Sequence, residues 1–515
     1  FSMAENDVKS MQDMQDPPKP THDWTRCQFY VPKKHRFCRQ VRLRDSKFCG
    51  NHAVGMHPSK KRIPCPLDPS HDILEDQLER HIAICPMSTR IKEIESRSYF
   101  RRGVNDGGHG KLGYKRPSQF IRSGNWAQTI AIKVLEIYER LFMKSQDFDS
   151  KITHQKISSE QIYQAIPTKD LSQPELEAGL SEAVEHFRIK IGGSKHLHQH
   201  ASLLGHLRVL RVLPIHPPKS LLESDKDDKR NSNILEILEM GAGRGILGLL
   251  TAGVAAAANH GDTQVCLTLV ERNGARSKAD TVLRKAKEPS AYMELHNVRW
   301  NRIQCDLSHI HVPSILSNTQ VANDTVVGSK RKQPLSTKKV VVVAKHLCGA
   351  GTDLALKSLE DLNVDVCLFA TCCHGVCSWE SFVGRDFLIE EFGSTSFGAF
   401  EFELLRKWSS GTVAQCKDTA NEHHVVEIDE HDPCSATAIA RTLNLTCGIQ
   451  GLGRACQRLL DIARCNYMER VLFKGSHDVS LCHYVNSDVT PQNAVIVARR
   501  KATLLHSLTN KGNKT

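Results

Sequence analysis

The spacing of apolar residues changes along the chain and divides it into a helical part and a mixed part. Apolar side chains recur at helical spacing between residues 125 and 142, and residues 174–213 have the pattern of one or two further helices. From about residue 230 onward, short apolar runs rich in β-branched residues alternate with helix-forming segments. The runs that predict strands are Ile234–Met240, Gln264–Val270, Arg302–Cys305, Lys339–Ala344, Val364–Ala370, Val471–Phe473, Val479–Val485 and Ala494–Ala498.

Most of these predicted strands are apolar without alternation, which is expected when a strand is buried on both faces of a mostly parallel sheet. Strands that alternate with helices predict a fold of the α/β class, here a Rossmann-like doubly wound domain. The predicted order is a disordered N-terminus at 1–22, a Cys3His finger at 23–56, a Cys-His-His-Cys finger at 60–90, a linker at 91–124, a helical substrate-binding segment at 125–230, and the α/β domain at 231–505 with an insertion at 312–338.

A glycine-rich turn follows the first predicted strand in the segment Glu239-Met-Gly-Ala-Gly-Arg-Gly245. Glycine is required where the backbone adopts unusual dihedral angles or where a ligand approaches without a Cβ in its way. The three glycines (Gly241, Gly243 and Gly245) therefore predict a nucleoside-type cofactor site, and Glu239 is expected to place a carboxylate at its mouth. The segment alone is also compatible with a dinucleotide fingerprint, since residues 243–248 read G-x-G-x-x-G, or with an ordinary strand-to-helix turn.

Two more acids stand at the ends of the next two predicted strands. Glu271 ends the second strand, where a carboxylate can accept hydrogen bonds from both hydroxyls of a ribose. Asp306 ends the third, where an adenine amino group would lie, although it is equally compatible with the N-cap of a helix. Together with Glu239 and the glycines, these acids predict an adenosine with an amino-acid tail. The expected cofactor is S-adenosylmethionine.

The segments after the fourth and fifth predicted strands carry the candidate reacting groups, because open α/β sheets bind ligands at the carboxyl ends of their strands. Lys345 and His346 follow the fourth strand, and His374 follows the fifth. A histidine or a lysine of lowered pKa can act as a base, and a cationic lysine can stabilise an alkoxide. These three residues are the catalytic candidates. The thiols beside His374 leave three alternatives open: a third metal site formed with Cys372, Cys373 and Cys377, a cysteine nucleophile, or buried thiols at a strand end without a chemical role.

Two sets of cysteines and histidines near the N-terminus have the count of closed tetrahedral zinc sites, and neither segment is large enough to fold unaided. A short helix is expected at residues 78–84, which would present two ligands of the second set on one face. The expected ligands of the two zinc ions are Cys27, Cys38, Cys49 and His52 in the first set and Cys65, His71, His81 and Cys85 in the second.

The charge of the chain is concentrated around these fingers. The formal net charge of the 515 residues is +12, and residues 1–120 hold 22 Lys and Arg against 14 Asp and Glu. Residues 26–62 contain eleven basic residues, interleaved with aromatic ones, and a single acid, Asp45. Basic and planar side chains on one small module favour RNA as the partner. The alternative is an ordinary solvated surface.

The eighteen cysteines do not indicate disulfides, because they cluster at short spacings behind an N-terminus that has no signal-peptide pattern. The chain is therefore expected inside the cell, in the cytoplasm or the nucleus. No apolar stretch is long enough to span a membrane, and nothing in the sequence indicates an obligate protein partner.

The order of these motifs resembles the eukaryotic tRNA 2′-O-methyltransferases that modify the fourth nucleotide of the acceptor stem. The resemblance spans Asp23 to Arg500 and includes both fingers, the residues from Lys195 to Ser202, the glycine-rich turn, Lys-His-Leu-Cys-Gly and Cys-Cys-His-Gly. It implies S-adenosylmethionine as the methyl donor, the tRNA acceptor stem as the partner, and tRNA-Gly, tRNA-Pro and tRNA-His as substrates. The second finger is also similar to that of a minor-spliceosome protein that contacts the 5′ splice site.

Other functions remain compatible with the residues themselves. The chain could be a zinc-finger RNA-binding adaptor with an inactive methyltransferase fold, or it could methylate a base or a protein. Lys195, His196 and His200 lie at helical spacing and could hold the acceptor stem, with a solvated helix face as the alternative. Three residues near the sixth predicted strand are expected to help close the pocket: Arg464, Asn466 and Tyr467.

Overall fold

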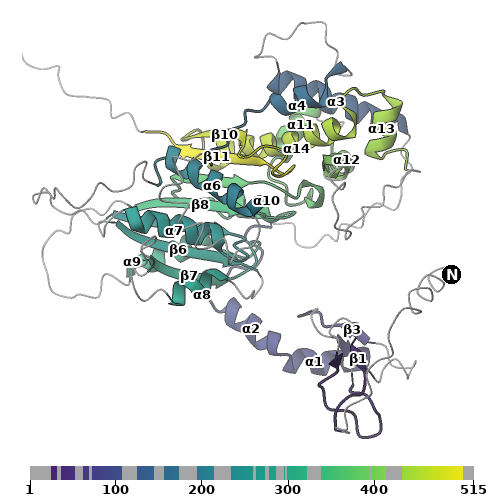
Figure 1. Cartoon of the computed structure of the whole chain (residues 1–515), viewed down its shortest axis with the longest axis vertical. Helices are drawn as coiled ribbons and strands as arrows, with labels where there is room; N and C mark the ends of the chain where they lie inside the picture. The colour runs from purple at the N-terminus through teal and green to yellow at the C-terminus, as the bar shows by residue number, and fades with distance from the viewer. Residues whose placement is uncertain are drawn as a thin grey trace, which may run out of the picture. The chain divides into compact units, whose positions relative to one another are not determined.

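The computed structural model (Figure 1) describes residues 25–31, 36–50, 52, 62–68, 72–106, 124–143, 156–172, 194–213, 233–258, 263–272, 278–285, 295, 298–321, 338–393, 397–412 and 432–502. The chain forms two compact units, Phe1–Ser96 and Arg97–Thr515. Within the described ranges, no helix is both long enough and apolar enough to cross a membrane.

The smaller unit consists of short elements arranged around its cysteines. An antiparallel pair β1–β2 lies between the first ligands, and a second pair β3–β4 leads through a short 3-10 helix into two helices. The helix expected at residues 78–84 is confirmed. The elements are β1 (Tyr30–Val31), β2 (Arg36–Phe37), β3 (Arg62–Pro64), β4 (Asp72–Leu74), η3 (Glu75–Gln77), α1 (Leu78–Ile84) and α2 (Pro86–Glu95).

The larger unit contains a seven-stranded sheet in the order β10-β11-β9-β8-β5-β6-β7. Strands β5 to β9 are parallel, and β11 pairs antiparallel with both β9 and β10. The buried positions of β5, β8 and β9 form unbroken runs, which explains the lack of alternation in the sequence. The strands are β5 (Asn233–Met240), β6 (Thr263–Glu271), β7 (Val298–Gln304), β8 (Lys338–Lys345), β9 (Val366–Ala370), β10 (His477–His483) and β11 (Ala494–Arg500).

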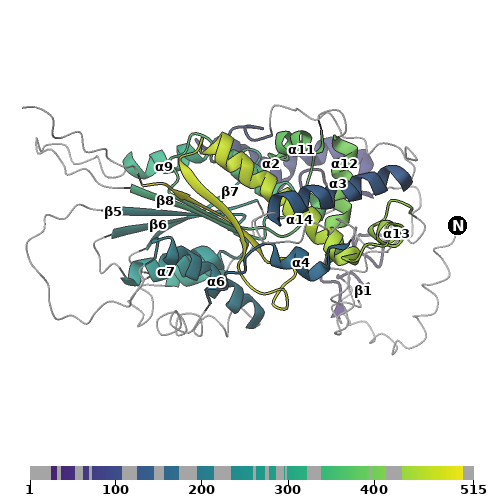
Figure 2. The same cartoon turned by 90° about the horizontal axis from the view of Figure 1, so that it is seen from above.

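The sheet has helices on both faces, as Figure 2 shows with α6 and α7 on one side of the strands and α9 on the other. The core of the first face includes Leu203 and Leu204 of α6 and Leu249 of α7, and that of the second includes Ile315 of α9 and Leu356 of α10. The α/β prediction is confirmed. These helices are α6 (Ser194–Val209), α7 (Ile246–Ala258), α8 (Lys278–Lys285), α9 (Val312–Val321) and α10 (Gly351–Lys357).

A third core lies beyond the sheet and is formed mainly by helices. Apolar residues of α3, such as Val134 and Tyr138, pack there with Phe402 of α12 and Leu459 of α14. The segment predicted as one helical domain at 125–230 is therefore divided, because α3 and α4 join this core whereas α6 packs on the sheet. Its helices are α3 (Gly124–Phe142), α4 (Ser159–Gln164), α11 (Arg385–Phe392), α12 (Ala399–Trp408), α13 (Ala436–Thr442) and α14 (Gly448–Tyr467), with the 3-10 turns η7 (His374–Val376) and η8 (Ser409–Thr412) nearby.

Three local predictions differ from the structure. The strand predicted at Val471–Phe473 is wrong, because α14 continues into the π-helical turn η9 (Met468–Leu472) and the Phe473 amide donates to Met468. The start of the predicted insertion at 312–338 is the helix α9, packed on the sheet through Ile315. In the predicted linker, the amide of Asn105 donates its side-chain hydrogens to the carbonyls of Leu307 and Ile310, so residues 97–106 belong to the larger unit.

Candidate functional site

The glycine-rich turn lies between β5 and α7, at the position where the strand order reverses. The chain runs from β5 outward to β6 and β7, and then returns to the other side of β5 as β8. The carboxyl ends of β5 and β8 therefore flank the crevice in which open α/β sheets bind their ligands. All the predicted site residues of the larger unit stand at or just after the ends of β5 to β9.

The three glycines of the turn have positive φ angles of 62°, 49° and 71° at Gly241, Gly243 and Gly245. Their surroundings differ. A Cβ at Gly241 would lie 2.1 Å from Cδ2 of Leu347, in the loop after β8, so this glycine permits close packing of the two loops. A Cβ at Gly243 would meet no described atom within 4 Å. Gly243 therefore presents bare backbone to open space, as a ligand-approach position requires.

The carboxylate of Glu271 lies beside the same turn. Its Oε2 accepts a hydrogen bond of 2.8 Å from the backbone amide of Gly243. Arg302 of β7 donates to the carbonyl of Gly243 at 3.2 Å and holds Asp280 at 2.9 Å. The turn is thus supported by side chains from two neighbouring strands, β6 and β7.

Glu239 does not occupy the place that the sequence indicated. The residue is 4% exposed, and its Oε2 accepts a 2.9 Å hydrogen bond from the amide of Gly248 in the first turn of α7. Burial raises the pKa of Glu239 to about 7, and the hydrogen bond from Gly248 offsets only part of that effect. The carboxylate fastens α7 to β5 beneath the turn. The expectation that it lies at the mouth of the turn is corrected.

Asp306 acts as a cap, but of a turn rather than of a helix. Its Oδ1 accepts hydrogen bonds from the amide and the hydroxyl of Ser308, at 2.9 and 2.8 Å. The next helix, α9, begins only at Val312. The Oδ2 atom of Asp306 lies 3.8 Å from the guanidinium of Arg272. One oxygen is thus committed to the local turn, and the other remains at the strand end where the adenine contact was predicted.

Lys345, the last residue of β8, lies against a histidine from α6. Its Nζ is 3.4 Å from Nε2 of His200, and both residues are buried. Burial lowers the pKa of Lys345 to about 8, against the opposing effect of the Glu239 carboxylate. The pKa of His200 is also lowered well below its ordinary value, first by burial and then by the charge of Lys345. A neutral His200 can therefore accept a hydrogen bond from the Lys345 ammonium.

His346 differs from Lys345 in being exposed. Its φ angle is 63°, in the left-handed region that side chains other than glycine rarely adopt, at a typical cost of about 1–2 kcal/mol. Its ring centroid lies 6.4 Å from that of His196 on α6, in an edge-to-face arrangement. An exposed imidazole therefore stands at the carboxyl end of β8.

His374 is placed elsewhere. It is 2% exposed, and its Nε2 lies 2.7 Å from Oδ1 of Asp461 on α14. Asp461 also accepts hydrogen bonds from Arg458 and from the hydroxyl of Thr371, at 3.1 Å each. Burial would raise the pKa of Asp461, but His374 and the arginines lower it to about 2. His374 therefore joins the loop after β9 to α14, and this placement argues against its predicted role as a base.

The predicted group of Cys372, Cys373, His374 and Cys377 does not assemble. Cys377 lies 3.1 Å from a guanidinium nitrogen of Arg464 and is not part of the group formed by the other thiols, and Arg464 is itself buried in an ion pair with Asp353. Arg464 is therefore committed to the core, and Tyr467 is 9% exposed with its hydroxyl donating to Glu360 at 2.6 Å. Closure of the pocket by Arg464, Asn466 and Tyr467 stays a prediction. In place of Cys377, Cys348 from the loop after β8 joins Cys372 and Cys373, and the three sulfur atoms lie within 4.8 Å of one another.

The first finger brings together all four of its predicted ligands. Nδ1 of His52 lies 3.3 Å from the sulfur of Cys27 and 3.4 Å from that of Cys49, and the sulfurs of Cys38 and Cys49 are 4.0 Å apart. Two thiolates on one tetrahedral zinc ion are about 3.8 Å apart if each lies about 2.3 Å from the metal. The donor set and its spacing therefore fit zinc.

The second finger gathers three of its four predicted ligands within the described residues. The sulfurs of Cys65 and Cys85 are 4.0 Å apart, and Nε2 of His81 lies 3.2 Å from the sulfur of Cys65. His71 lies outside the described residues. The three described groups have the spacing of a zinc site with one ligand still to be added.

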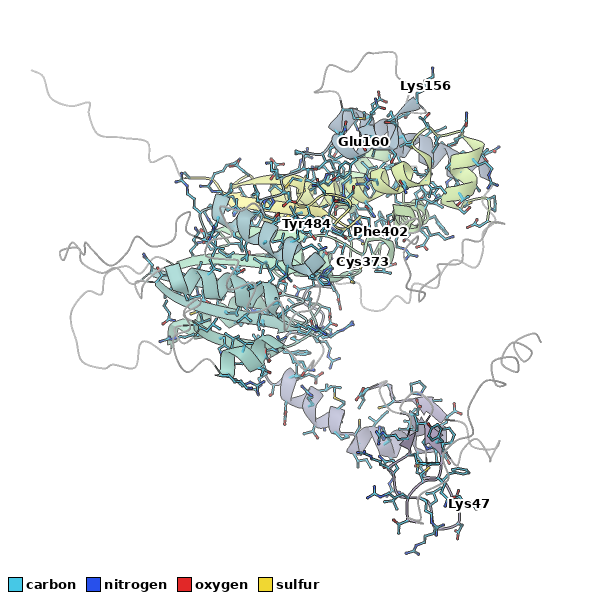
Figure 3. All side chains as sticks on the ribbon, viewed as in Figure 1. Lys47, Lys156, Glu160, Cys373, Phe402 and Tyr484 are labelled. Carbon is cyan, nitrogen blue, oxygen red and sulfur yellow. The ribbon has the colours of Figure 1, made fainter. Side chains whose placement is uncertain are left out.

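The surface of the first finger combines positive charge with exposed apolar groups. Phe29 is 40% exposed and stacks on the ring of His52 at a centroid distance of 4.0 Å, while Val41 is 72% exposed. The exposed basic residues are Arg26, Arg36, Arg39, Arg44 and Lys47, the last of which is labelled in Figure 3. Such a surface can contact both a phosphate backbone and an unstacked base.

Sequence reasoning missed the partners that complete the site. The helical spacing of His200 from His196 predicts contact with RNA, yet the side chain of His200 is buried against a lysine 145 residues away. Asp461 and Cys348 stand 87 and 25 residues from the groups they contact, His374 and Cys373. The one available signal for the burial of His200 is the run of leucines at helical spacing after it, Leu203, Leu204 and Leu207.

Comparisons with known proteins agree with this arrangement. Residues 198–499 match the family model described as methyltransferase TRM13, residues 25–53 the CCCH zinc finger in TRM13 protein, and residues 62–86 the U11-48K-like CHHC zinc finger. The chain is 24% identical over 491 residues to the tRNA:m(4)X modification enzyme TRM13 of Vanderwaltozyma polyspora, covering 92% of this chain and 97% of the relative. The mouse and human homologues are each 25% identical, covering 92% of this chain and 94% of the relative.

Proposed function

The chain belongs to the TRM13 methyltransferase family, and on this premise we propose that it methylates the ribose 2′-hydroxyl of the fourth nucleotide in a tRNA acceptor stem. S-adenosylmethionine is the proposed methyl donor, and tRNA-Gly, tRNA-Pro and tRNA-His are the proposed substrates. The relatives are named tRNA:m(4)X modification enzymes, and the match to them runs through both fingers and the sheet.

The observation that carries the donor assignment is the open space at Gly243 beside the Glu271 carboxylate. A nucleoside can approach the bare backbone there, while Glu271 accepts a hydrogen bond from a ribose hydroxyl and Asp306 offers an acceptor at the next strand end. S-adenosylmethionine supplies a methyl group on a sulfonium, which an oxygen nucleophile can take by in-line displacement.

We assign the removal of the ribose proton to Lys345. With a pKa of about 8, roughly a tenth of the Lys345 side chains are neutral at pH 7 and can accept the 2′-hydroxyl proton as the methyl group is transferred. His200, held neutral by burial, accepts a hydrogen bond from the resulting ammonium. The ammonium then returns its proton to solvent. His346, exposed at the same strand end, is the proposed contact to the acceptor nucleotide.

The fingers are proposed to bind the RNA. Their zinc ions organise a basic surface that contacts phosphates without selecting a sequence, while the exposed Phe29 provides a stacking face. Thiolate ligands must stay reduced to hold zinc, which favours the interior of the cell as the site of action.

The decisive experiment incubates the full chain with unmodified tRNA transcripts and methyl-labelled S-adenosylmethionine, followed by digestion and identification of the labelled nucleoside. A 2′-O-methylated nucleoside from position four is expected. A methylated base would refute the ribose assignment, and the absence of any product would favour an RNA-binding adaptor.

Donor binding is measured separately by calorimetry. Wild-type protein should bind S-adenosylmethionine, and Glu271→Ala should bind it about tenfold to a hundredfold more weakly because a charged hydrogen-bond acceptor is lost. Asp478→Ala, an exposed carboxylate on β10, is the matched control and should bind normally. Equal affinities of wild type and Glu271→Ala would remove Glu271 from the donor site.

A further inference from the structure

Two cysteines beside the proposed methyl-transfer site are exposed and nearly in contact. Among the cysteines that the structure describes, only Cys348 and Cys373 are exposed. Their sulfur atoms lie 2.9 Å apart. Cys348 belongs to the loop after β8, and Cys373, labelled in Figure 3, belongs to the loop after β9. Two reactive groups from neighbouring strand ends therefore meet at the surface.

The two fingers show the distance between cysteine sulfurs at predicted zinc sites of the same structure, to which the Cys348–Cys373 distance can be compared. Pairs of cysteine sulfurs in both fingers are 4.0 Å apart, close to the distance of about 3.8 Å for two thiolates on one tetrahedral zinc ion. The pair Cys348–Cys373 is 1.1 Å closer than either finger pair (4.0 minus 2.9 Å). Closure of the remaining gap to a disulfide of about 2.05 Å requires a movement of less than about 1 Å. The spacing favours a covalent bond over a shared metal ion.

The third thiol makes Cys348 the nucleophile of the pair. Cys372 is 6% exposed and lies 3.5 Å from the sulfur of Cys373. Hydrogen bonds from Cys372 and Cys373 hold the pKa of Cys348 well below its ordinary value, whereas the pKa of each of those partners is raised. A thiolate at Cys348, flanked by protonated thiols, is the reactive form in oxidation and in thiol exchange.

We propose that Cys348 and Cys373 form a redox-active dithiol whose closure to a disulfide stops methyl transfer. With a hydroperoxide as oxidant, the Cys348 thiolate attacks the peroxide oxygen, which breaks the O–O bond and yields a sulfenic acid and, after protonation, water or an alcohol. The Cys373 sulfur then attacks the sulfenyl sulfur, and its proton leaves with the displaced hydroxide as water. Two thiols are oxidised by two electrons, and the peroxide takes up both.

The proposal that this disulfide stops methyl transfer rests on the proposed function. Cys348 lies three residues after Lys345 and two after the strained His346, and Cys373 immediately precedes His374, which is fixed to α14 through Asp461. A disulfide would therefore tie the loop that carries the proposed base to an anchored loop. Alignment of a base with a reacting hydroxyl tolerates displacements of only a fraction of an ångström, so even a small shift lowers the rate.

The bond itself is tested on the full, zinc-loaded chain without reference to activity. The protein is treated with hydrogen peroxide, alkylated, digested without reduction and examined by mass spectrometry. A Cys348–Cys373 cross-link that dithiothreitol removes is expected in wild type and in the control Cys434→Ser, a partly exposed cysteine elsewhere in the unit. It should be absent from Cys348→Ser and from Cys373→Ser. Free, alkylated Cys348 and Cys373 after oxidation would overturn the proposal.

Metal content and activity complete the test. A third zinc equivalent in untreated protein that disappears in Cys348→Ser would overturn the proposal and assign the three thiols to a metal. Oxidised wild type should lose about tenfold or more of its methyl transfer to tRNA and recover it with dithiothreitol, while retaining its two zinc ions. A cross-linked enzyme that keeps full activity would overturn the proposal that the disulfide stops methyl transfer. A cross-link in a protein that never methylates tRNA would instead refute the proposed function.

Discussion

The two fingers and the sheet-edge site employ the same kinds of side chain but assemble them over very different lengths of chain. In the first finger, Cys27 and His52 meet across 25 residues. At the sheet edge, Lys345 meets His200 across 145 residues, and His374 meets Asp461 across 87. A short ligand spacing specifies its own geometry once a metal binds, whereas the sheet-edge site exists only after the whole larger unit has folded.

This difference predicts that metal removal affects the two regions unequally, and we expect it to have the largest effect of any change to the protein. Among the residues of the second finger that the structure describes, the core consists of Cys65, Ile73 and Cys85 with a few partly buried neighbours. Loss of its zinc should remove about 10 kcal/mol or more of apparent folding free energy. A strong chelator should therefore make residues up to about 96 sensitive to limited proteolysis and leave the larger unit resistant. Fingers that stay resistant without metal would contradict the comparison.

The second prediction concerns the base. Lys345→Ala should lower the rate of methyl transfer about 10²- to 10⁴-fold, the usual contribution of a general base, while donor binding is retained. Because the neutral form of Lys345 is the active one, the wild-type rate should rise with pH and level off above a pH of about 8. Lys407→Ala, an exposed lysine paired with Asp432, is the control. A flat pH profile together with normal turnover in Lys345→Ala would exclude this lysine.

The third prediction tests whether Asp461 and His374 stabilise the fold or take part in methyl transfer. Asp461→Asn leaves His374 and the buried arginines without their shared carboxylate, and should lower the free energy of unfolding by about 3–5 kcal/mol. The pKa of Asp461 is lowered to about 2 in the fold, so its contribution is present above the unfolded pKa of about 4 and disappears as the pH falls through about 2.

Chemical denaturation at several pH values measures this effect. The ion pair between the exposed Lys407 and the partly exposed Asp432 offers the comparison variant Asp432→Asn, which should change stability by less than about 1 kcal/mol. If His374→Gln abolished methyl transfer without any loss of stability, His374 would return to the catalytic candidates.

The smallest expected effect comes from substituting Gly243, and a comparison with Gly448 separates the loss of donor binding from the cost of backbone strain. Gly243 and Gly448 have similar φ angles, 49° and 58°, and a Cβ at either would meet no described atom within 4 Å. Substitution by alanine should therefore cost each a similar 1–2 kcal/mol or so in stability. Only Gly243→Ala should also weaken S-adenosylmethionine binding, by about tenfold, because only there does the Cβ enter the proposed donor site. Equal donor affinities in calorimetry would remove the turn from that site.

The successes and errors of the sequence predictions follow the same division. The helix at 78–84, the sheet and the glycine-rich turn were predictable, because periodicity, ligand spacing and glycine placement are local properties. The strand predicted at Val471–Phe473 failed because a long helix overrode a short β-branched run. The helical segment at 125–230 was divided because sequence does not show which of two cores a helix will join.

The sequence by itself determined which residue types stand at each strand end and in each finger, and therefore the family and the class of chemistry. The tertiary structure alone decided what each of those residues can do. In the folded chain, Glu239 is buried and accepts a hydrogen bond from α7, and His374 contacts Asp461. Lys345 lies against His200, which belongs to a helix on one face of the sheet. The physical reason is that a side chain's protonation and direction depend on its solvent exposure and on neighbours that are distant in sequence, and only folding brings these together.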